Sequence, residues 1–411
     1  MKTSATSSVI FHIDVNSAYL SWEAVDRLQH GEAKDLRHLV AVVGGDEASR
    51  HGIVLAKSIP AKKYGILTGE SLFSARQRCP DLVVVPPRYS LYMQCSDALM
   101  ELLKSYSPVI QRYSIDEAFL AYQPSTNDLQ EILTAAHRLR QQIKTELGFT
   151  VNVGIGPNKL LAKMASEFNK PDQVHTLFRE EIPPKMWPLS VRELFFVGRA
   201  TAKKLQYYGI YTIGQLAATN PHLIHQWLKK PGLLIWQYAN GWDDSSLHDQ
   251  GLPLKSIGNS STISFDVTCQ ETAHQILLAL SEKVGGRLRA IGKCAQIVSV
   301  SIRSSELITR SHQQRLDTPI DATLLIHRYA CRLFDEAWHH EPIRHLGIHL
   351  SALCSNDFYQ LSLFSPNLDR LTRLDATLDH LRRRFGDASV FRGCFTHSPI
   401  PPLMGGVLQE Q

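Results

Sequence analysis

The chain has 411 residues, of which 44% are hydrophobic and 20% charged, and its formal net charge is +5. This length indicates more than one domain, and the composition excludes wholesale disorder and a collagen-like repeat. The mild positive charge permits a polyanionic partner but does not require one. Seven cysteines without a CxxC pair favour reduced thiols over a disulfide framework or a zinc site.

The N-terminal sequence MKTSATSSVIFHID has only a short apolar run, which His12 and Asp14 interrupt, so it lacks the core of a signal peptide. No later apolar run of the sequence is long enough to span a bilayer. We therefore expect a cytoplasmic protein that has no membrane partner.

Strands and helices alternate over the first 175 residues or so. VIFHID at residues 9–14 predicts a strand, and SAYLSWEAVDRL after it predicts a helix. A basic segment at residues 55–72, broken by Pro60 and Gly65, indicates a small inserted module. Beyond it, the helix-like LQEILTAAHRLRQQIKTEL, the strand-like FTVNVGIG and the helix-like PNKLLAKMASEFNKP complete an α+β pattern.

The second half of the chain changes character twice. From about residue 183, short helical stretches broken by Pro and Gly predict a helical domain. Asp, Ser and Gly then cluster near residues 243–254, which indicates a linker. The helix-like EKVGGRLRAIGKC and the alternating AQIVSVSIRSS that follow predict a second, separate α+β domain.

Two adjacent acids interrupt the strand-like stretch RYSIDEAFLAY at residues 112–122. In a regular strand Asp116 and Glu117 point to opposite faces, so both reach one site only where the chain turns or bulges. An exposed turn is the simpler explanation of this pair alone. Asp14 also ends an apolar strand, where it could serve as a helix N-cap. Three acids on neighbouring strands, however, form a cage suited to Mg²⁺.

A strand, a glycine turn and a helix start coincide in GIGPNK, which places Lys159 where a phosphate can bind. The stretch is not a P-loop, because GxxxxGK followed by Ser or Thr is missing. A single lysine there is equally typical of solvated surface. Together with Lys62 and the three acids, Lys159 indicates nucleotidyl transfer, in which metal ions activate a hydroxyl and neutralise the leaving pyrophosphate.

With these motifs the chain resembles the Y-family translesion DNA polymerases, in particular a DNA polymerase IV-like branch, over roughly residues 8–390. YSIDEAFL is close to the family signature S-[IL]-D-E-[AC], FHIDVNSAYLSWEAV carries the first acid, and GIGPNKLLAKMASEFNKP matches the helix after the last palm strand. The resemblance implies an α+β multidomain protein, shaped like a right hand. Its parts would be a ferredoxin-like palm, small fingers, a helical thumb and a separate α+β little finger.

The resemblance also assigns boundaries to these domains along the chain. The implied order is palm at 1–25 and 75–175, fingers at 26–74, thumb with a helix-hairpin-helix at 176–243, linker at 244–254, little finger at 255–355, and a clamp-binding motif with a C-terminal tail at 356–411.

Carried over residue by residue, the resemblance implies that Asp14, Asp116 and Glu117 are catalytic and bind two Mg²⁺. The carbonyl oxygen of Val15 would be a further ligand. Asn16 stands where many family members have a second acid, and it is not counted among the ligands.

The nucleotide would rest on backbone amides that follow the first acid. Tyr19, five residues after Asp14, matches the aromatic steric gate of the family, whose ring excludes a ribose hydroxyl. Without the family register, Tyr19 would be taken for a core aromatic of the first helix. At the family's Y-x-A-R finger motif this chain has Ile59 and Lys62, so an aromatic contact is lost and a guanidinium fork becomes a point charge. The implied nucleotide-binding residues are Ser17, Ala18, Tyr19, Lys62 and Lys159.

DNA would be held by the thumb and the little finger. LFFVGRATAKKL aligns with the family's helix-hairpin-helix, although Phe195 and Phe196 replace the usual Pro-Gly, and an ordinary α-hairpin fits it equally well. Cations of the little finger would contact phosphates, which position a duplex without reading its sequence. Each of them alone is typical of solvated surface. The implied DNA-binding residues are Val197, Gly198, Arg199, Lys203, Lys255, Arg287, Arg289 and Arg303.

QLSLF at residues 360–364 resembles the pentapeptide that binds the bacterial sliding clamp. Gln360 would hydrogen-bond to the clamp while the apolar side chains of Leu361, Leu363 and Phe364 enter a groove. The same apolar residues could instead pack on the helix predicted after them.

We therefore predict a monomeric DNA-directed DNA polymerase, a nucleotidyltransferase that acts in DNA repair by translesion synthesis on primer-template DNA and dNTPs. A DNA- and clamp-binding accessory protein that has lost synthesis is the main alternative, and retention of all three acids argues against it. A nucleotidyl cyclase on a similar palm would leave the later domains unexplained. Primer extension by the purified protein separates the first two.

Overall fold

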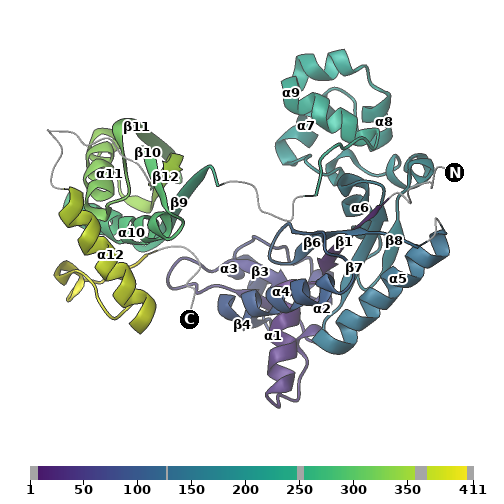
Figure 1. Cartoon of the computed structure of the whole chain (residues 1–411), viewed down its shortest axis with the longest axis horizontal. Coiled ribbons are helices and arrows are strands. Elements are labelled where there is room, and N and C mark those ends of the chain that lie inside the picture. Colours follow the sequence, from purple (N-terminus) through teal and green to yellow (C-terminus); the bar gives the residue numbers. More distant parts are fainter. Residues whose placement is uncertain (1–7, 126–127, 248–253, 357–367, 405–411) are drawn as a thin grey trace. The chain divides into compact units, whose positions relative to one another are not determined.

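A computed structural model describes residues 8–125, 128–247, 254–356 and 368–404, and it divides the chain into two compact units. The first unit holds most of residues 8–247. The second unit holds residues 254–404 together with two short segments, Gly45–Ile53 and Ser71–Phe73. Figure 1 shows the elements of both units in the colours of the sequence.

The first unit contains eight strands and nine helices among its described residues. In chain order they are β1 Val9–Val15, α1 Ala18–Gln29, β2 Ala41–Gly44, β3 Val54–Lys57, α2 Ile59–Lys63, α3 Leu72–Arg78 (shared with the second unit), β4 Val83–Val85, α4 Tyr89–Lys104, β5 Ile110–Arg112, β6 Glu117–Tyr122, α5 Leu129–Gln142, β7 Val151–Gly156, α6 Lys159–Ser166, β8 Val174–Thr176, α7 Arg199–Tyr207, α8 Ile213–Ala218 and α9 Pro221–Ala239.

A five-stranded sheet with the order β5-β6-β1-β7-β8 forms the centre of this unit. The middle strand β1 runs antiparallel to both β6 and β7, and Asp14 faces Glu117 on one side and Asn152 on the other. Every residue of β1 is buried. This burial explains why β1 is mostly apolar on both of its faces, with His12 and Asp14 as its buried polar residues.

Apolar side chains from one face of the sheet and from the helices packed on it form the main core of the first unit. Phe11 and Ile13 of β1 pack in one cluster with Trp22 of α1, Leu99 of α4 and Leu139 of α5. All five side chains are fully buried. Because helices cover the sheet, a polar residue at the end of β1 lies in a site from which bulk water is largely excluded.

The helices α6 to α9 share a second apolar core. Leu161 of α6 belongs to the same cluster as Leu205 of α7, Leu216 of α8 and Ile235 of α9. The shared cluster joins α6, which follows strand β7 of the central sheet, to the helical region. Short helices broken by Pro and Gly were predicted here, and α9 is indeed kinked, with Lys229 in the left-handed region at a φ of 59° just before Pro231.

The second unit is an antiparallel sheet with the order β11-β10-β12-β9, packed against two helices. Its order along the chain is strand, helix, strand, strand, helix, strand, followed by one more helix. The elements are β9 Ser256–Val267, α10 Gln270–Ala290, β10 Lys293–Ser304, β11 Thr309–Ile320, α11 Thr323–Ala337, β12 Ile343–Ser355 and α12 Leu368–Phe385. The separate α+β domain expected in this half of the chain is therefore present.

Buried ion pairs hold α12 and the residues after it on the second unit. Glu282 of α10 is 2% exposed, and its carboxylate pairs with Arg382 at 2.7 Å and with Arg392. Arg289 of α10 pairs with Asp379 at 2.6 Å and with Asp375 at 3.3 Å. The segment predicted as a tail is thus in part a docked helix.

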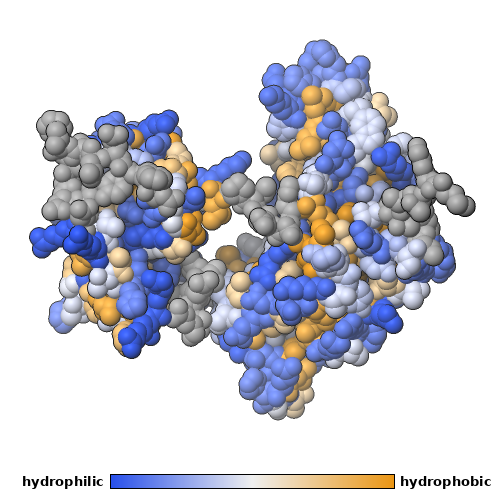
Figure 2. Space-filling model, in the orientation of Figure 1, coloured by the Kyte–Doolittle hydropathy of each residue, from blue (hydrophilic) through white to orange (hydrophobic). Residues whose placement is uncertain are grey.

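Figure 2 shows hydrophilic residues over most of the visible face of both units, with hydrophobic residues gathered in smaller patches between them. Within the described ranges, no helix combines the length and the apolar character needed to cross a membrane.

Candidate active site

The chain bends at residues 114–116, immediately before β6 begins at Glu117. The Ser114 hydroxyl holds this bend, because it donates to Asp116 Oδ1 at 2.6 Å and accepts from the Asp116 amide at 3.3 Å. The Val15 amide donates to the Asp116 carbonyl oxygen at 3.1 Å, which ties the bend to the end of β1. A bend therefore lies where the sequence analysis required one.

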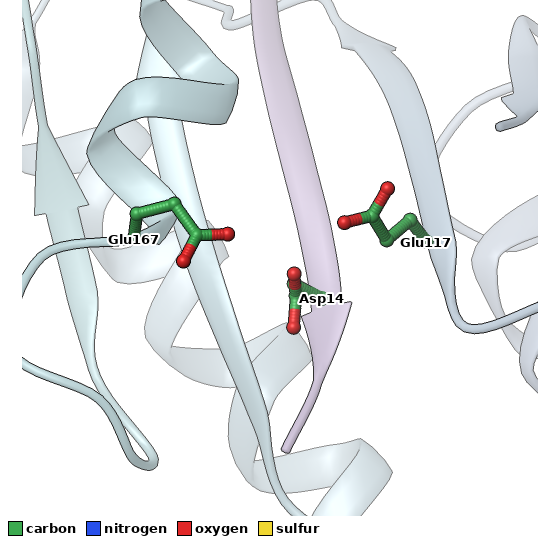
Figure 3. A group of neighbouring side chains, drawn as sticks. All are labelled: Asp14, Glu117 and Glu167. Carbon is green, nitrogen blue, oxygen red and sulfur yellow. The ribbon is translucent and has the colours of Figure 1, made fainter. Parts of the chain in front are cut away.

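Three carboxylates meet at the end of β1, and Figure 3 shows them pointing toward one another. Asp14 comes from β1, Glu117 from the start of β6, and Glu167 from the residue that follows α6. One oxygen atom of each lies within 4.8 Å of the others, which is close enough to share a metal ion. Two of the three predicted acids are thus in this set. Asp116 lies outside it, and Glu167 was not singled out from the sequence.

Two lysines balance the negative charge of this cluster. Lys163 Nζ lies 2.6 Å from Glu117 Oε1. Lys170 Nζ lies 3.1 Å from Asp14 Oδ2 and 2.9 Å from Glu167 Oε1. The sequence analysis passed over both lysines; Lys163 lies on α6, whereas Lys170 lies beyond its C-terminal end, where helical spacing does not predict its position.

Lys163 also contacts aromatic rings of the first unit. Its Nζ lies 5.2 Å from the ring centroid of Tyr113 and 5.4 Å from that of Phe195, within the range of a cation–π contact. Phe195 in turn stacks with Tyr238 of α9, with centroids 6.3 Å apart. The cation that pairs with Glu117 is therefore also part of the contact between the sheet and the helical region.

Burial and charge both act on Asp14. Its pKa is raised to about 7, chiefly because burial disfavours the charged form. Lys170 opposes this shift, whereas the carboxylates of Glu167 and Glu117 add to it. A divalent cation would favour the ionised form of all three groups, so this oxygen-rich, partly buried set fits a hard cation such as Mg²⁺.

His12 lies on the same strand as Asp14, two residues before it. Its Nδ1 is 2.7 Å from Ser166 Oγ, and its Nε2 is 4.0 Å from Glu117 Oε2. Burial lowers the pKa of His12 well below its usual value, with help from the nearby lysines. His12 is therefore neutral and adds no positive charge to the cluster.

The polar residue after β1 positions the segment that carries Lys170. Asn16 is 8% exposed, and its side chain donates to Asn152 Oδ1 at 3.2 Å. The Asp172 amide donates to Asn16 Oδ1 at 2.9 Å. Asn16 thus has a structural role near the site, consistent with leaving it out of the predicted ligands.

The turn from β1 into α1 places backbone amides beside the acids. Ser17 is the N-cap of α1 in the left-handed conformation, with a φ of 50°, and Ala18 is the first residue of the helix. The amides of a helix's first turn have no partner within the helix, so they can receive an anion. Ser17 and Ala18, which were predicted to bind the triphosphate, are thus at the N-terminal end of α1.

Tyr19 is half-buried and packs against a second tyrosine. Its ring stacks on Tyr92 with centroids 4.5 Å apart and planes 9° apart, and it meets Tyr89 edge to face. The pKa of Tyr19 is raised, chiefly by burial and then by the Asp116 carboxylate. Tyr19 is therefore close to the acids and is held rigidly by its neighbours.

Lys159 and Lys62, which were predicted to bind phosphate, are not among the lysines that the structure describes in ion pairs with the acids. Lys159 Nζ donates to the Ser246 carbonyl oxygen at 2.9 Å and lies 6.0 Å from the ring centroid of Phe119. Lys62 is exposed on α2, near Ile59, which is 44% exposed. Neither lysine has an ion pair with the acids among the described contacts, where Lys163 and Lys170 take that place.

The predicted hairpin turn lies at the start of α7. Gly198 is the N-cap and Arg199 the first helical residue, while Lys203 is exposed one turn later. Val197 is 8% exposed, so only its backbone could contact DNA. Phe196, which stands at the family's glycine, has a φ of 69°, a region that costs an L side chain conformational energy.

The predicted DNA-binding cations of the second unit differ in exposure. Lys255, Arg287 and Arg303 are exposed. Arg289 is only 9% exposed in its side chain and pairs with Asp379. Its charge is thus already neutralised by α12, which argues against a phosphate contact. The QLSLF pentapeptide lies outside the described residues.

Comparisons with family models and with individual known proteins agree with one another. Residues 13–167 match the model of the impB/mucB/samB family, and residues 254–363 match the model of that family's C-terminal domain. DNA polymerase IV of Clostridium acetobutylicum is 49% identical, over 94% of this chain and 98% of its own length. DNA polymerase IV of Acetivibrio thermocellus is 39% identical, over 94% of this chain and 96% of its own.

The fold has a match among solved structures. A Y-family DNA polymerase chimera, Dbh-Dpo4(243-245)-Dbh, superimposes with a TM-score of 0.73 at 20% identity. The match covers 85% of this chain and 100% of the chimera. At this identity the likeness concerns the fold, and it confirms the predicted polymerase architecture with its separate little finger.

The chain therefore belongs to the impB/mucB/samB family, the Y family of DNA polymerases, and within it to the DNA polymerase IV branch. The predicted enzyme class, a DNA-directed DNA polymerase of the translesion type, is confirmed. The cluster of Asp14, Glu117 and Glu167 is consistent with its catalytic site.

The charge balance at the carboxylates predicts that removing a lysine makes the fold depend on divalent cations. Lys170→Met leaves Asp14 and Glu167 without their cation, so we expect a loss of about 1–3 kcal/mol in the free energy of unfolding with EDTA present. Mg²⁺ should restore more stability to this variant than to the wild type, because it replaces the missing charge. Thermal unfolding with EDTA and with Mg²⁺ measures both effects.

Lys104→Met is the matched control, because Lys104 pairs with Glu101 on an exposed helix face. Its melting temperature should follow the wild type under both conditions. Equal Mg²⁺-induced shifts in the wild type and in Lys170→Met would contradict the charge-balance explanation.

Proposed function

We propose that the active site of this translesion polymerase joins a primer 3′-hydroxyl to the α-phosphorus of a dNTP with two Mg²⁺ ions bound. Asp14, Asp116 and Glu117 are the proposed catalytic ligands, with the Val15 carbonyl oxygen as a further one. The observation that carries this proposal is that the Asp14 and Glu117 carboxylates converge at the end of β1, beside the start of α1, with Asp116 in the bend that is hydrogen-bonded to Val15.

The protein's own contribution is to hold acids and donors in one rigid place. The β1–β6 register sets Asp14 opposite Glu117, and Ser114 fixes the Asp116 carboxylate in the bend. When bound, Mg²⁺ lowers the pKa of the attacking hydroxyl and neutralises charge on the leaving pyrophosphate. Because the acids are fixed before the reaction, little reorganisation accompanies the chemical step.

The proposed triphosphate site combines backbone amides and lysines. Ser17 and Ala18 supply amides at the start of α1, and Lys62 and Lys159 are the cations carried over from the sequence resemblance. The structure adds Lys170 as a candidate, since its ammonium already lies at Asp14. A metal ion that takes over the charge of Asp14 would free this ammonium to meet a phosphate oxygen.

Substitution of the acids tests which carboxylates are ligands. We expect Asp14→Ala, Asp116→Ala and Glu117→Ala each to reduce primer extension by at least 10³-fold, about 4 kcal/mol of transition-state stabilisation. DNA binding should be spared, because these acids repel phosphate. Glu167→Ala should cost less, since Glu167 mainly holds Lys170. Extension and DNA affinity would be measured on the same primer-template.

The ranking of these variants decides between two ligand sets. A larger loss in Glu167→Ala than in Asp116→Ala would replace Asp116 by Glu167 among the ligands. Undiminished extension in Asp14→Ala or Glu117→Ala would reject the proposed mechanism altogether.

Tyr19 is the proposed steric gate against ribonucleotides. We expect Tyr19→Ala to admit ribonucleotides at least tenfold more readily relative to dNTPs, because the flat ring that blocks a 2′-hydroxyl is removed. Single-nucleotide incorporation of dNTP and rNTP pairs measures this ratio. Tyr19→Phe keeps the ring and should keep the discrimination between dNTPs and rNTPs. If Tyr19→Ala discriminated as strongly as the wild type does, the gate role would be rejected.

Duplex DNA is the proposed partner of two cationic regions. The hairpin turn with Val197, Gly198 and Arg199, followed by Lys203, offers amides and cations to one phosphate strand. The exposed Lys255, Arg287 and Arg303 are the proposed phosphate contacts of the little finger. These exposed cations suit a polymerase that must hold DNA of any sequence.

The QLSLF pentapeptide is the proposed contact with a sliding clamp, on sequence evidence alone. We expect Gln360→Ala combined with Phe364→Ala to abolish capture of the chain by an immobilised clamp, because both the hydrogen bond and the deepest apolar anchor are lost. Ser362→Ala changes the residue between the anchors and should bind as the wild type does. Capture that survives the double substitution would reject the contact.

We further propose that the polymerase acts as a monomer in the cytoplasm. Seven cysteines without a disulfide among the described residues fit a reducing compartment. The bacterial origin of the DNA polymerase IV relatives supports the same location for this chain.

A further inference from the structure

The helical region of the first unit carries an aromatic surface that the proposed polymerase function does not use. Tyr207 and Tyr208, at the C-terminal end of α7, are 84% and 39% exposed. Tyr208 stacks on Trp227 of α9 with centroids 4.0 Å apart and planes 5° apart. Tyr207 meets Tyr208 edge to face at 5.3 Å. We call Tyr207, Tyr208 and Trp227 the aromatic platform.

The charged residues in the segment that carries this platform are all positive. Residues 194–242 contain no aspartate and no glutamate, whereas they contain Arg199, Lys203, Lys204, Lys229 and Lys230. Lys204 lies directly against the platform, because its ammonium donates to the Trp227 carbonyl oxygen at 2.6 Å. Lys229 and Lys230 follow Trp227 closely along α9 and are exposed. The complementary partner is therefore a polyanion.

The platform is separate from the proposed hairpin contact with duplex DNA. That contact lies at the N-terminal end of α7, near Gly198, whereas Tyr207 is the last residue of the same helix. A rise of about 1.5 Å per residue places the two ends roughly 12 Å apart. A phosphate held at the turn therefore leaves the tyrosine rings uncovered.

The rings further select which polyanion fits. An exposed, flat ring offers a stacking face to an unpaired base, whereas the bases of a duplex are already stacked on one another. Stacking on Trp227 holds the Tyr208 ring in place, so little side-chain freedom remains to be lost on binding. Flat rings flanked by lysines are the combination with which proteins bind single strands without sequence preference.

We propose that the aromatic platform binds single-stranded DNA. The exposed ring of Tyr207 stacks on an unpaired base, and Lys204, Lys229 and Lys230 contact the flanking phosphates. This site goes beyond the proposed polymerase function, since it requires neither a primer end nor a nucleotide. It would let the enzyme hold an unpaired strand while the active site holds a primer-template.

The test uses the full chain, saturated with an unlabelled blunt hairpin duplex so that the duplex site is occupied. Binding of labelled oligo(dT) is then compared with binding of an abasic oligonucleotide of equal length, which has phosphates but no bases. We expect the wild type to favour oligo(dT) about tenfold. Tyr207→Leu should remove this preference, because it keeps an apolar side chain but loses the ring, and Tyr207→Phe should retain it.

A second variant tests the phosphate contacts. Lys229→Gln combined with Lys230→Gln should weaken binding of both oligonucleotides equally and make binding less dependent on salt. Primer extension of each variant on a short primer-template should match the wild type, which shows that the fold and the polymerase site are intact. An unchanged base preference in Tyr207→Leu would overturn the proposal. It would also be overturned if no wild-type preference existed, as expected of a surface that binds a protein.

Discussion

Repulsion between three closely spaced carboxylates is the constraint on which the first unit depends. Asp14, Glu117 and Glu167 offer oxygens within 4.8 Å of one another, and of the three Asp14 is buried, Glu117 is half-buried and Glu167 is exposed. Like charges so close destabilise a fold unless cations compensate for them. Lys163 and Lys170 provide that compensation. The local sequence around α6 is therefore as much a part of the active site as the strands that carry the acids.

This requirement accounts for several features that are otherwise unrelated. The buried side-chain amides of Asn16 and Asn152 are hydrogen-bonded to each other. Asn16 also accepts from the Asp172 amide, which fixes the backbone near Lys170 and so the position of its ammonium. On the other side, Lys163 lies over the ring of Phe195 while it pairs with Glu117. Phe195, which replaces a residue of the family's hairpin motif, thus contributes to the environment of a proposed catalytic acid.

Much of the fold could be predicted because its signals are local. The largely apolar stretch at residues 9–14 predicted strand β1, and the helical periodicity of residues 129–147 predicted α5, which ends at Gln142 and continues as a turn of π-helix. The pair Asp116 and Glu117 implied a bend, since adjacent residues of a regular strand face apart. These inferences needed no knowledge of distant contacts.

The remaining features depend on partners far apart in the sequence. Lys170 meets Asp14 across 156 positions, and only the register of the sheet brings them together. Arg289 looked like an exposed cation on a basic helix, but α12 covers it with Asp375 and Asp379. Lys159 was likewise taken for a free cation, although its ammonium is bound to a backbone carbonyl of residue 246. Tertiary pairing, rather than residue type, decides which cations remain available.

The docked helix α12 determines where the little finger ends as an independently folding domain. A chain cut after β12 would remove the ion-pair partners of Glu282 and Arg289, which α12 and the residues after it supply. A buried charge without its partner is far more costly than a buried pair. The smallest self-sufficient little finger therefore extends to about residue 404, and its boundary is defined by charge neutrality rather than by the last strand of its sheet.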